Sequence, residues 1–136
     1  MKILVVVRER AETGEIEKML QRIVPKSEAD QDDRDDCRKV IGIAGDGKTG
    51  YEMIRRECPD LVLADVELPE MGGLEMLEKL REDHSDVKAV LLAEKEDFSQ
   101  AKRAIDLEVE GYLVKPVRAD ELRQAVVGAG EKVKRA

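Results

Sequence analysis

The chain alternates between five short apolar runs and longer segments in which apolar residues recur at helical spacing. The runs are rich in Val, Ile and Leu and lack alternating polar residues, which is typical of strands buried on both faces of a sheet. They comprise Ile3 to Val7, Val40 to Ala44, Leu61 to Ala64, Val87 to Ala93 and Tyr112 to Val114. We therefore expect five buried strands.

The segments between these runs carry apolar stripes at the i, i+3, i+4, i+7 spacing of amphipathic helices. The stripes are Ile16 to Ile23, Tyr51 to Ile54, Leu74 to Leu80, Phe98 to Ile105 and Leu122 to Val133. Strand followed by helix, five times over, predicts a parallel sheet with right-handed crossovers and helices on both faces. The predicted fold class is therefore α/β: a flavodoxin-like, doubly wound, five-stranded sheet with strand order 2-1-3-4-5.

Length and composition narrow the possible functions. The 136 residues suffice for one domain, which we expect to cover 1–136. A net charge of −7 argues against nucleic acid or an anionic membrane as a partner of this domain. No apolar run has membrane-spanning length, and the amino-terminal run is predicted to be a strand rather than a signal peptide. Cys37 and Cys58 have no metal-type spacing, so we expect free thiols and a cytoplasmic location.

One segment interrupts the alternation. Ser27 to Asp36 contains six acidic residues and one arginine, and it has almost nothing to bury. A mobile acidic surface loop is the expected structure. A calcium-binding loop is the alternative, but the glycine and the terminal glutamate of that motif are absent.

The segment Gly42 to Thr49 matches the phosphate-binding pattern G-x-x-x-x-G-K-[ST]. In a working P-loop the first glycine ends the strand, so that the following amides can curl around phosphate. Here Ile43 and Ala44 continue the apolar run beyond Gly42. We therefore favour a strand through Ala44 and a turn at Gly45 to Gly47, and keep a small P-loop-like nucleotide-binding protein as an alternative function.

An aspartate and a lysine end two of the predicted strands. Asp65 closes the most apolar stretch of the chain, and Lys115 closes Gly111-Tyr-Leu-Val-Lys-Pro116. In open α/β sheets, residues at the carboxyl ends of the strands face the ligand-binding crevice. Lys115 can meet Asp65 there as a point charge suited to a carboxylate or a phosphoryl group.

Six stretches of the sequence resemble the CheY-like receiver domains of response regulators in two-component (phosphorelay) signalling. They are Met1–Val6, Ile41–Gly47, Pro59–Asp65, Leu68–Leu77, Asp97–Leu107 and Glu110–Val117. The resemblance covers nearly the whole chain except the acidic segment, and is closest to receivers attached to AraC-type DNA-binding domains. Its most specific part is the joint spacing of Asp65, Pro69, Gly73 and the Lys115-Pro116 pair.

The resemblance implies a phosphoacceptor at Asp65 and a phosphoryl-contacting lysine at Lys115. It also implies two acids after the first strand that hold magnesium, but Val7 and Arg8 stand there, with Glu9 the remaining acid. A hard divalent cation prefers oxygen ligands, so magnesium is expected to bind weakly or not at all. Any weak site would use Glu9, Asp65 and Glu67. Arg8 is a candidate replacement cation that would pair with Asp65, or with Glu9 as second choice.

The switch positions of the family fall on Ala93 and Tyr112. Ala93 replaces the hydroxyl residue that would bond the phosphoryl group, whereas the aromatic residue is kept as Tyr112. The interpretation is an atypical receiver with a degenerate site. Simpler interpretations remain for each residue: Asp65 as a strand-end acid without chemistry, Lys115 as part of a cis-proline turn, and Tyr112 as a packing residue.

The function predicted on this basis is protein–protein recognition by a non-enzymatic receiver, whose partner is a histidine kinase or an output domain. The expected recognition surface, which would also serve for a homodimer, combines the predicted helix at Phe98, the strand at Tyr112 and the helix at Leu122. Basic residues in this half favour an acidic partner surface. They are Lys95, Lys102, Arg103 and Lys115. The alternative from the same family is a phosphorylatable receiver with an unusual cation site.

Overall fold

The computed structural model describes residues 1–22 and 39–135. In this part of the chain five parallel strands form one sheet in the order β2-β1-β3-β4-β5. The strands are β1 (Lys2–Val6), β2 (Lys39–Ala44), β3 (Leu61–Asp65), β4 (Lys88–Ala93) and β5 (Gly111–Val114). The helices are α1 (Arg10–Gln21), α3 (Gly47–Glu57), α4 (Gly73–Glu82), α5 (Phe98–Asp106) and α6 (Ala119–Arg135). The predicted fold class and strand order are confirmed.

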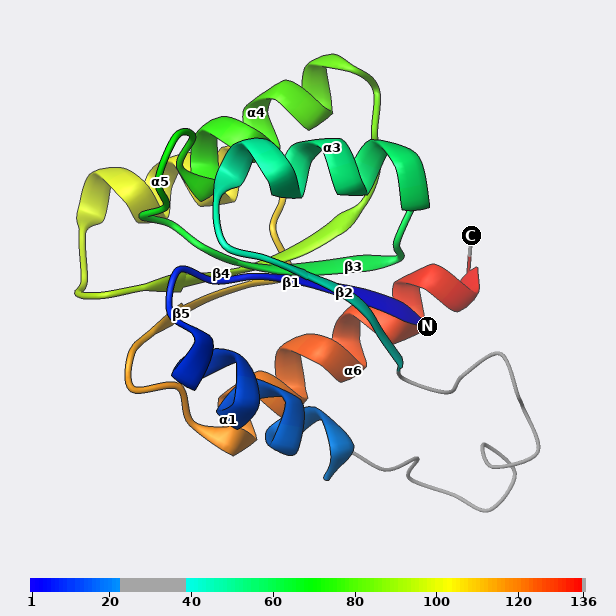
Figure 1. The fold of residues 1–136 in the computed structure, drawn as a ribbon, viewed down its shortest axis with the longest axis vertical. Helices are drawn as coiled ribbons and strands as arrows, with labels where there is room; N and C mark the ends of the chain where they lie inside the picture. Colours follow the sequence, from blue (N-terminus) through cyan, green and yellow to red (C-terminus); the bar gives the residue numbers. More distant parts are fainter. Residues whose placement is uncertain (23–38, 136) are drawn as a thin grey trace.

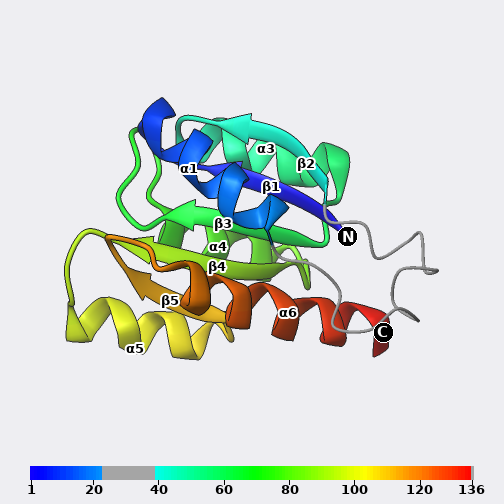
Figure 2. The same cartoon turned by 90° about the horizontal axis from the view of Figure 1, so that it is seen from below.

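The sheet lies between two layers of helices, with α1 and α6 on one face and α3, α4 and α5 on the other (Figure 1, Figure 2). Successive residues of β1 face opposite layers. Ile3 and Val5 pack with the α1 and α6 side chains, whereas Leu4 and Val6 pack with those of the other layer. This two-sided burial explains why the apolar runs show no polar alternation.

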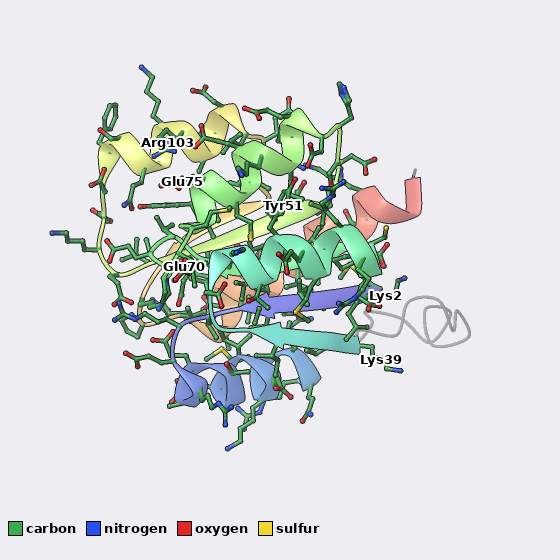
Figure 3. The ribbon with its side chains drawn as sticks, turned by 45° about the horizontal axis from the view of Figure 1, so that its top comes forward. Lys2, Lys39, Tyr51, Glu70, Glu75 and Arg103 are labelled. Atoms are coloured by element: carbon green, nitrogen blue, oxygen red, sulfur yellow. The ribbon has the colours of Figure 1, made fainter. Side chains whose placement is uncertain are left out.

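All five strands run in one direction, so the sheet has one amino edge and one carboxyl edge. Lys2 and Lys39 are paired at the amino edge, and Figure 3 shows them at the starts of β1 and β2. Glu70, in the loop after β3, lies at the other end of the molecule (Figure 3). The carboxyl edge is where ligands bind in open α/β sheets.

Two expectations concern residues outside the described part of the chain. The acidic segment Ser27 to Asp36, with its calcium-loop alternative, lies there, and so does Cys37. Cys58, which is described, is an exposed free thiol. Across 1–22 and 39–135 no helix is both long enough and apolar enough to cross a membrane.

Candidate functional site

The carboxyl edge of the sheet brings together side chains from four strands. Asp65 is the last residue of β3, Ala93 is the last residue of β4, and Val7 and Lys115 directly follow β1 and β5. Backbone hydrogen bonds extend the sheet into this edge: the Lys115 amide donates to the Ala93 carbonyl at 2.8 Å, and the Val7 amide to that of Ala44 at 3.0 Å. The positions singled out in the sequence therefore form one site.

Asp65 is the buried acid of the site, with only 3% of its surface exposed. Its Oδ2 accepts a hydrogen bond from the backbone N–H of Arg8 at 2.9 Å. Its Oδ1 lies 2.8 Å from the Lys115 Nζ. That oxygen is buried and accepts no well-directed hydrogen bond from the described residues, so its contact with Lys115 is an ion pair without hydrogen-bond alignment.

Lys115 contacts three carboxylates at once. Its Nζ donates to Glu12 Oε2 at 2.7 Å and to Glu94 Oε1 at 2.9 Å, in addition to the ion pair with Asp65. Only 13% of the lysine side chain is exposed, against 27% for Glu12 and 53% for Glu94. The ammonium is thus nearly enclosed by acids contributed by α1, β3 and the loop after β4. We call these four residues the lysine cluster.

The charges of the lysine cluster do not balance, because one ammonium faces three carboxylates. Burial alone would lower the pKa of Lys115, but its contacts with Asp65, Glu12 and Glu94 outweigh burial and raise that pKa well above the usual value. Burial raises the pKa of Asp65. The ammonium of Lys115 and the Arg8 amide oppose this shift, while the charge of Glu12 adds to it. Lys115 is therefore firmly cationic, and Asp65 is the acid that carries the cost of burial.

Arg8 does not take the role first expected of it. Its backbone amide reaches Asp65, but its side chain is 55% exposed, and its guanidinium lies 3.9 Å from the Glu9 carboxylate. The predicted pairing of the guanidinium with Asp65 is wrong, since Lys115 holds that place. The second choice, Glu9, is met only at the outer limit of an ion pair, between two solvent-screened groups.

The residues around Asp65 do not fit the magnesium ion that the family implies. Val7 is 2% exposed and belongs to the core cluster with Ile16. Glu9 and Glu67 are exposed. Over the described ranges no three His, Cys, Asp or Glu side chains are grouped so as to hold a metal ion. Val7 and Arg8 stand where the resemblance implies oxygen ligands, so the residues present do not fit the ion.

Of the two residues predicted as switch positions, Ala93 and Tyr112, a side-chain hydrogen bond joins Tyr112 to a helix. Ala93 is 1% exposed and offers no hydroxyl. Tyr112 is half-buried against the core between the sheet and α3, α4 and α5, and its hydroxyl bonds to Gln100 Oε1 of α5 at 3.2 Å. Burial raises the pKa of Tyr112, and the charge of Asp97 adds to this. The Tyr112 hydroxyl is therefore held to α5 by a hydrogen bond in which Ala93 takes no part.

Glu12 and Glu94 are site residues that the sequence reasoning missed. Glu94 follows Ala93 directly, so its neighbour in the sequence pointed to the site, whereas Glu12 lies in the first turn of α1, three residues after Glu9. The Lys115–Pro116 peptide bond is cis, in agreement with the turn considered for it.

The P-loop-like segment, Gly42 to Thr49, forms the end of β2 and the start of α3. Strand β2 continues through Gly42, which pairs with Leu4, and ends at Ala44, as predicted. Asp46 then caps α3: its carboxylate accepts from the Thr49 amide at 2.7 Å and from the Thr49 hydroxyl at 2.9 Å.

Gly47, the second glycine of that segment, is required for packing. A Cβ on it would lie 1.7 Å from the Met71 carbonyl oxygen, and its amide donates to the Pro69 carbonyl. The loop after β3 therefore covers the start of α3, and the Thr49 amide and hydroxyl, which a P-loop would offer to phosphate and magnesium, already donate to Asp46. This geometry does not favour the nucleotide-binding alternative.

Comparisons with known proteins identify the family of this chain. The family model described as the response regulator receiver domain matches residues 31–127. The luminescence regulatory protein LuxO of Vibrio campbellii is 33% identical over 89 residues, which are 65% of this chain and 20% of LuxO. The nitrate/nitrite response regulator NarL of Escherichia coli is 34% identical over 96 residues, which are 69% of this chain and 44% of NarL. The chain therefore spans about a fifth of LuxO and less than half of NarL.

Solved structures share the fold over nearly the full length. The receiver domain of AraT, a response regulator from Geobacillus stearothermophilus, has a TM-score of 0.76 and 25% identity, covering 98% of this chain and 95% of that one. A response regulator receiver domain protein from Clostridium thermocellum has a TM-score of 0.79 at 24% identity, covering 98% and 97%. The chain belongs to the response regulator receiver domain family.

Proposed function

We propose that this receiver domain of two-component signalling acts by protein–protein recognition, with weak or absent magnesium-dependent phosphorylation at Asp65 and no enzymatic activity of its own. One observation carries the proposal: Asp65 is paired with Lys115 at 2.8 Å in a site where Val7 and Arg8 replace the acids that would hold a metal.

Phosphoryl transfer to a carboxylate brings two anionic groups together, and a bound metal ion normally neutralises the developing charge. Among the described residues, the cation next to Asp65 is the Lys115 ammonium, which is already shared among three carboxylates. The acid left near the end of β1, Glu9, is exposed and lies nearest to Arg8. These features support slow or absent transfer by the usual metal-assisted route.

The alternative from the same family is a receiver that is phosphorylated through an unusual cation site. The retained pair of Asp65 and Lys115 favours it, because both groups are needed to accept and contact a phosphoryl group. In that case Lys115 rather than Arg8 would supply the positive charge, since the Arg8 guanidinium is not the group that pairs with Asp65.

A labelling experiment separates these two functions. The native chain, Asp65→Asn and the double variant Val7→Asp with Arg8→Asp are incubated with acetyl phosphate and millimolar magnesium, and covalent phosphate is followed by intact mass. We expect the native chain to match Asp65→Asn over the time in which the double variant becomes labelled. Labelling of the native chain at the rate of the double variant would favour the alternative. Because Val7 is buried, circular dichroism must first show that the double variant is folded.

The surface that we propose for the protein partner lies on α5 and continues over β5 and α6. Phe98 and Ile105 are large apolar residues of α5 with 85% and 74% of their surface exposed. Seven residues apart, they lie on one face of the helix, where an exposed apolar patch marks an interaction site. The proposed partner is a histidine kinase or an output domain. The resemblance to receivers of AraC-type regulators makes an AraC-type DNA-binding domain our proposed output, in a cytoplasmic regulator.

The basic character expected of this surface needs one correction. Lys115 does not belong to it, because its ammonium is enclosed by the lysine cluster. Arg103 is partly neutralised by an ion pair with Glu78 of α4. Of the four basic residues expected there, Lys95 and Lys102 remain exposed.

Removing the apolar patch tests the surface. The double variant Phe98→Ala with Ile105→Ala should weaken capture of the cognate kinase or output domain. The control is Ile43→Ala, which shortens a 47% exposed side chain on β2. Strand β2 is the outer strand of the sheet farthest from β5. Equal capture by both variants would contradict the assignment. Sedimentation equilibrium of the native chain and the double variant decides whether the same patch forms a homodimer.

A further inference from the structure

Glu12 and Glu94 have no part in the expected chemistry of the site, yet they make the well-directed hydrogen bonds to its lysine. Lys115 donates to Glu12 at 2.7 Å and to Glu94 at 2.9 Å. The oxygen of Asp65 that faces the same ammonium is buried and accepts no well-directed hydrogen bond from the described residues. The two glutamates thus accept the well-directed hydrogen bonds of the ammonium, whereas Asp65 meets it as an ion pair.

Resting on the function proposed above, we propose that Glu12 and Glu94 are positioning residues that occupy the hydrogen bonds of the Lys115 ammonium, and so oppose its turn toward a phosphoryl group and the phosphorylation of Asp65. The step opposed is attack of an Asp65 carboxylate oxygen on the phosphorus of acetyl phosphate. In that step an oxygen–phosphorus bond forms at Asp65, the bond from phosphorus to the acetyl oxygen breaks, and acetate leaves with the electron pair.

The first reason is geometric. A phosphoryl group on Asp65 Oδ1 would need the lysine ammonium for itself, since that oxygen is already 2.8 Å from Nζ. To turn toward the new group, Lys115 would have to weaken its hydrogen bonds to Glu12 and Glu94. Charge-assisted hydrogen bonds of this kind are stronger than neutral ones.

The second reason is charge. The lysine cluster carries three carboxylates against one ammonium, so it has an excess of two negative charges when all four residues are ionised. A phosphoryl group brings about −1.5 to −2 charge at pH 7. Because the described residues form no metal site beside Asp65, this charge would face the carboxylates of Glu12 and Glu94, where repulsion at close range is strong.

The two glutamates should not contribute equally. The Glu12 side chain is 27% exposed and that of Glu94 is 53% exposed. Water screens the more exposed charge, so Glu12 should oppose phosphorylation more strongly than Glu94.

The experiment replaces each glutamate by its neutral isostere. Glu12→Gln, Glu94→Gln and the double variant are made in the native chain and in the Val7→Asp, Arg8→Asp background, and labelling by acetyl phosphate is timed. Matched controls are Glu15→Gln, an exposed acid one turn further along α1, and Glu96→Gln, an exposed acid in the loop that holds Glu94. Each control removes the same charge without removing a hydrogen bond to Lys115.

We expect the double Glu→Gln variant to be labelled about tenfold faster than its parent, with the larger part from Glu12→Gln, and the controls to stay within about twofold. An unchanged or slower rate would overturn the proposal. So would an equal acceleration by the control variants, which would show a general effect of net charge.

A second measurement reports on Lys115 directly in the native background, where no buried residue is altered. The ¹⁵N resonance of its ammonium should shift and its protons should exchange faster with water in Glu12→Gln, but not in Glu15→Gln. An unchanged resonance would mean that Glu12 does not position the lysine. Failure of this inference is distinct from failure of the proposed function, which would appear as fast labelling of the native chain itself.

Discussion

Lys115 and Glu12 are 103 residues apart in the sequence, and their charged atoms lie 2.7 Å apart in the folded chain. The contact links the end of β5 to the first turn of α1 across the carboxyl edge of the sheet. It is part of a cluster in which one ammonium serves three carboxylates, the most buried of which is Asp65. The stability and the reactivity of the site should therefore both depend on Lys115.

The first prediction concerns loss of that lysine. Lys115→Met should lower the free energy of unfolding by about 1–3 kcal/mol at neutral pH, because it leaves the buried carboxylate of Asp65 without its partner. Urea denaturation measures this change. The control is Lys102→Met, an exposed residue of α5, which should change stability by less than about 0.5 kcal/mol. Equal effects of the two substitutions would contradict the role given to Lys115.

The second prediction concerns pH and Asp65. The pKa of Asp65 is raised in the folded chain above its usual 3.8, so its ionisation favours the unfolded state. The stability that this group contributes is present below pH 3.8 and is lost as the pH rises through its folded-state pKa.

Asp65→Asn removes this ionisation and leaves Lys115 with Glu12 and Glu94. The free energy of unfolding of Asp65→Asn should therefore increase relative to that of the native chain as the pH rises from 3.8 toward neutrality. Denaturation at a series of pH values tests this. If the stability of the variant instead falls relative to that of the native chain as the pH rises, the Lys115 ammonium stabilises ionised Asp65 by more than burial destabilises it.

The third prediction uses two glycines to test how the carboxyl edge is packed. A Cβ on Gly47 would lie 1.7 Å from the Met71 carbonyl, whereas one on Gly14 of α1 would meet nothing within 4 Å. Gly47→Ala should cost about 2 kcal/mol or more through strain, and Gly14→Ala should stabilise the chain by about 0.5–1 kcal/mol through helix propensity. A tolerated Gly47→Ala would show that the loop after β3 does not rest on the start of α3.

Hydrophobic pattern alone sufficed for the fold, because strands buried on both faces and helices buried on one face leave different periods in the sequence. The same pattern predicted that Gly42 lies within a strand, because Ile43 and Ala44 continue the strand past the point where a phosphate-binding loop would begin. The positions of Asp65 and Lys115 also followed, because the ends of parallel strands must share an edge.

The partners of these two residues could not be predicted in the same way. Whether the side chain or the backbone amide of Arg8 meets Asp65 depends on how the chain turns into α1, and the amide makes that contact. Glu12 reaches Lys115 only because α1 lies beside the end of β5, a contact between residues 103 apart. Among the many acids of this chain, nothing local distinguishes Glu12 from Glu15.

The fourth prediction concerns Tyr112. Its hydroxyl bonds to Gln100 at 3.2 Å, so Tyr112→Phe should cost about 0.5–1.5 kcal/mol and shift the amide resonances at the start of α5. Gln100→Ala should shift the same amides. If the two variants perturb different residues, the tyrosine is not held to α5 by this bond.

The central claim is that the site does not work as a magnesium-dependent phosphoryl switch, and an NMR titration of the native chain tests it most directly. Amide spectra are recorded with magnesium alone and with magnesium and beryllofluoride, a mimic of the phosphoryl group. The variant Val7→Asp, Arg8→Asp, Ala93→Thr serves as the control in which ligands and hydroxyl are restored together, because these residues should act as one unit.

In the native chain we expect no amide shifts near Asp65 that saturate below millimolar magnesium. We also expect no movement of Tyr112 or α5 with beryllofluoride. A ligand shifts a two-state equilibrium only through contacts that differ between the states, and Ala93 lacks the hydroxyl for such a contact. The triple variant should show both. Shifts in the native chain that saturate at sub-millimolar magnesium and extend from Asp65 through Ala93 to Tyr112 would contradict the account.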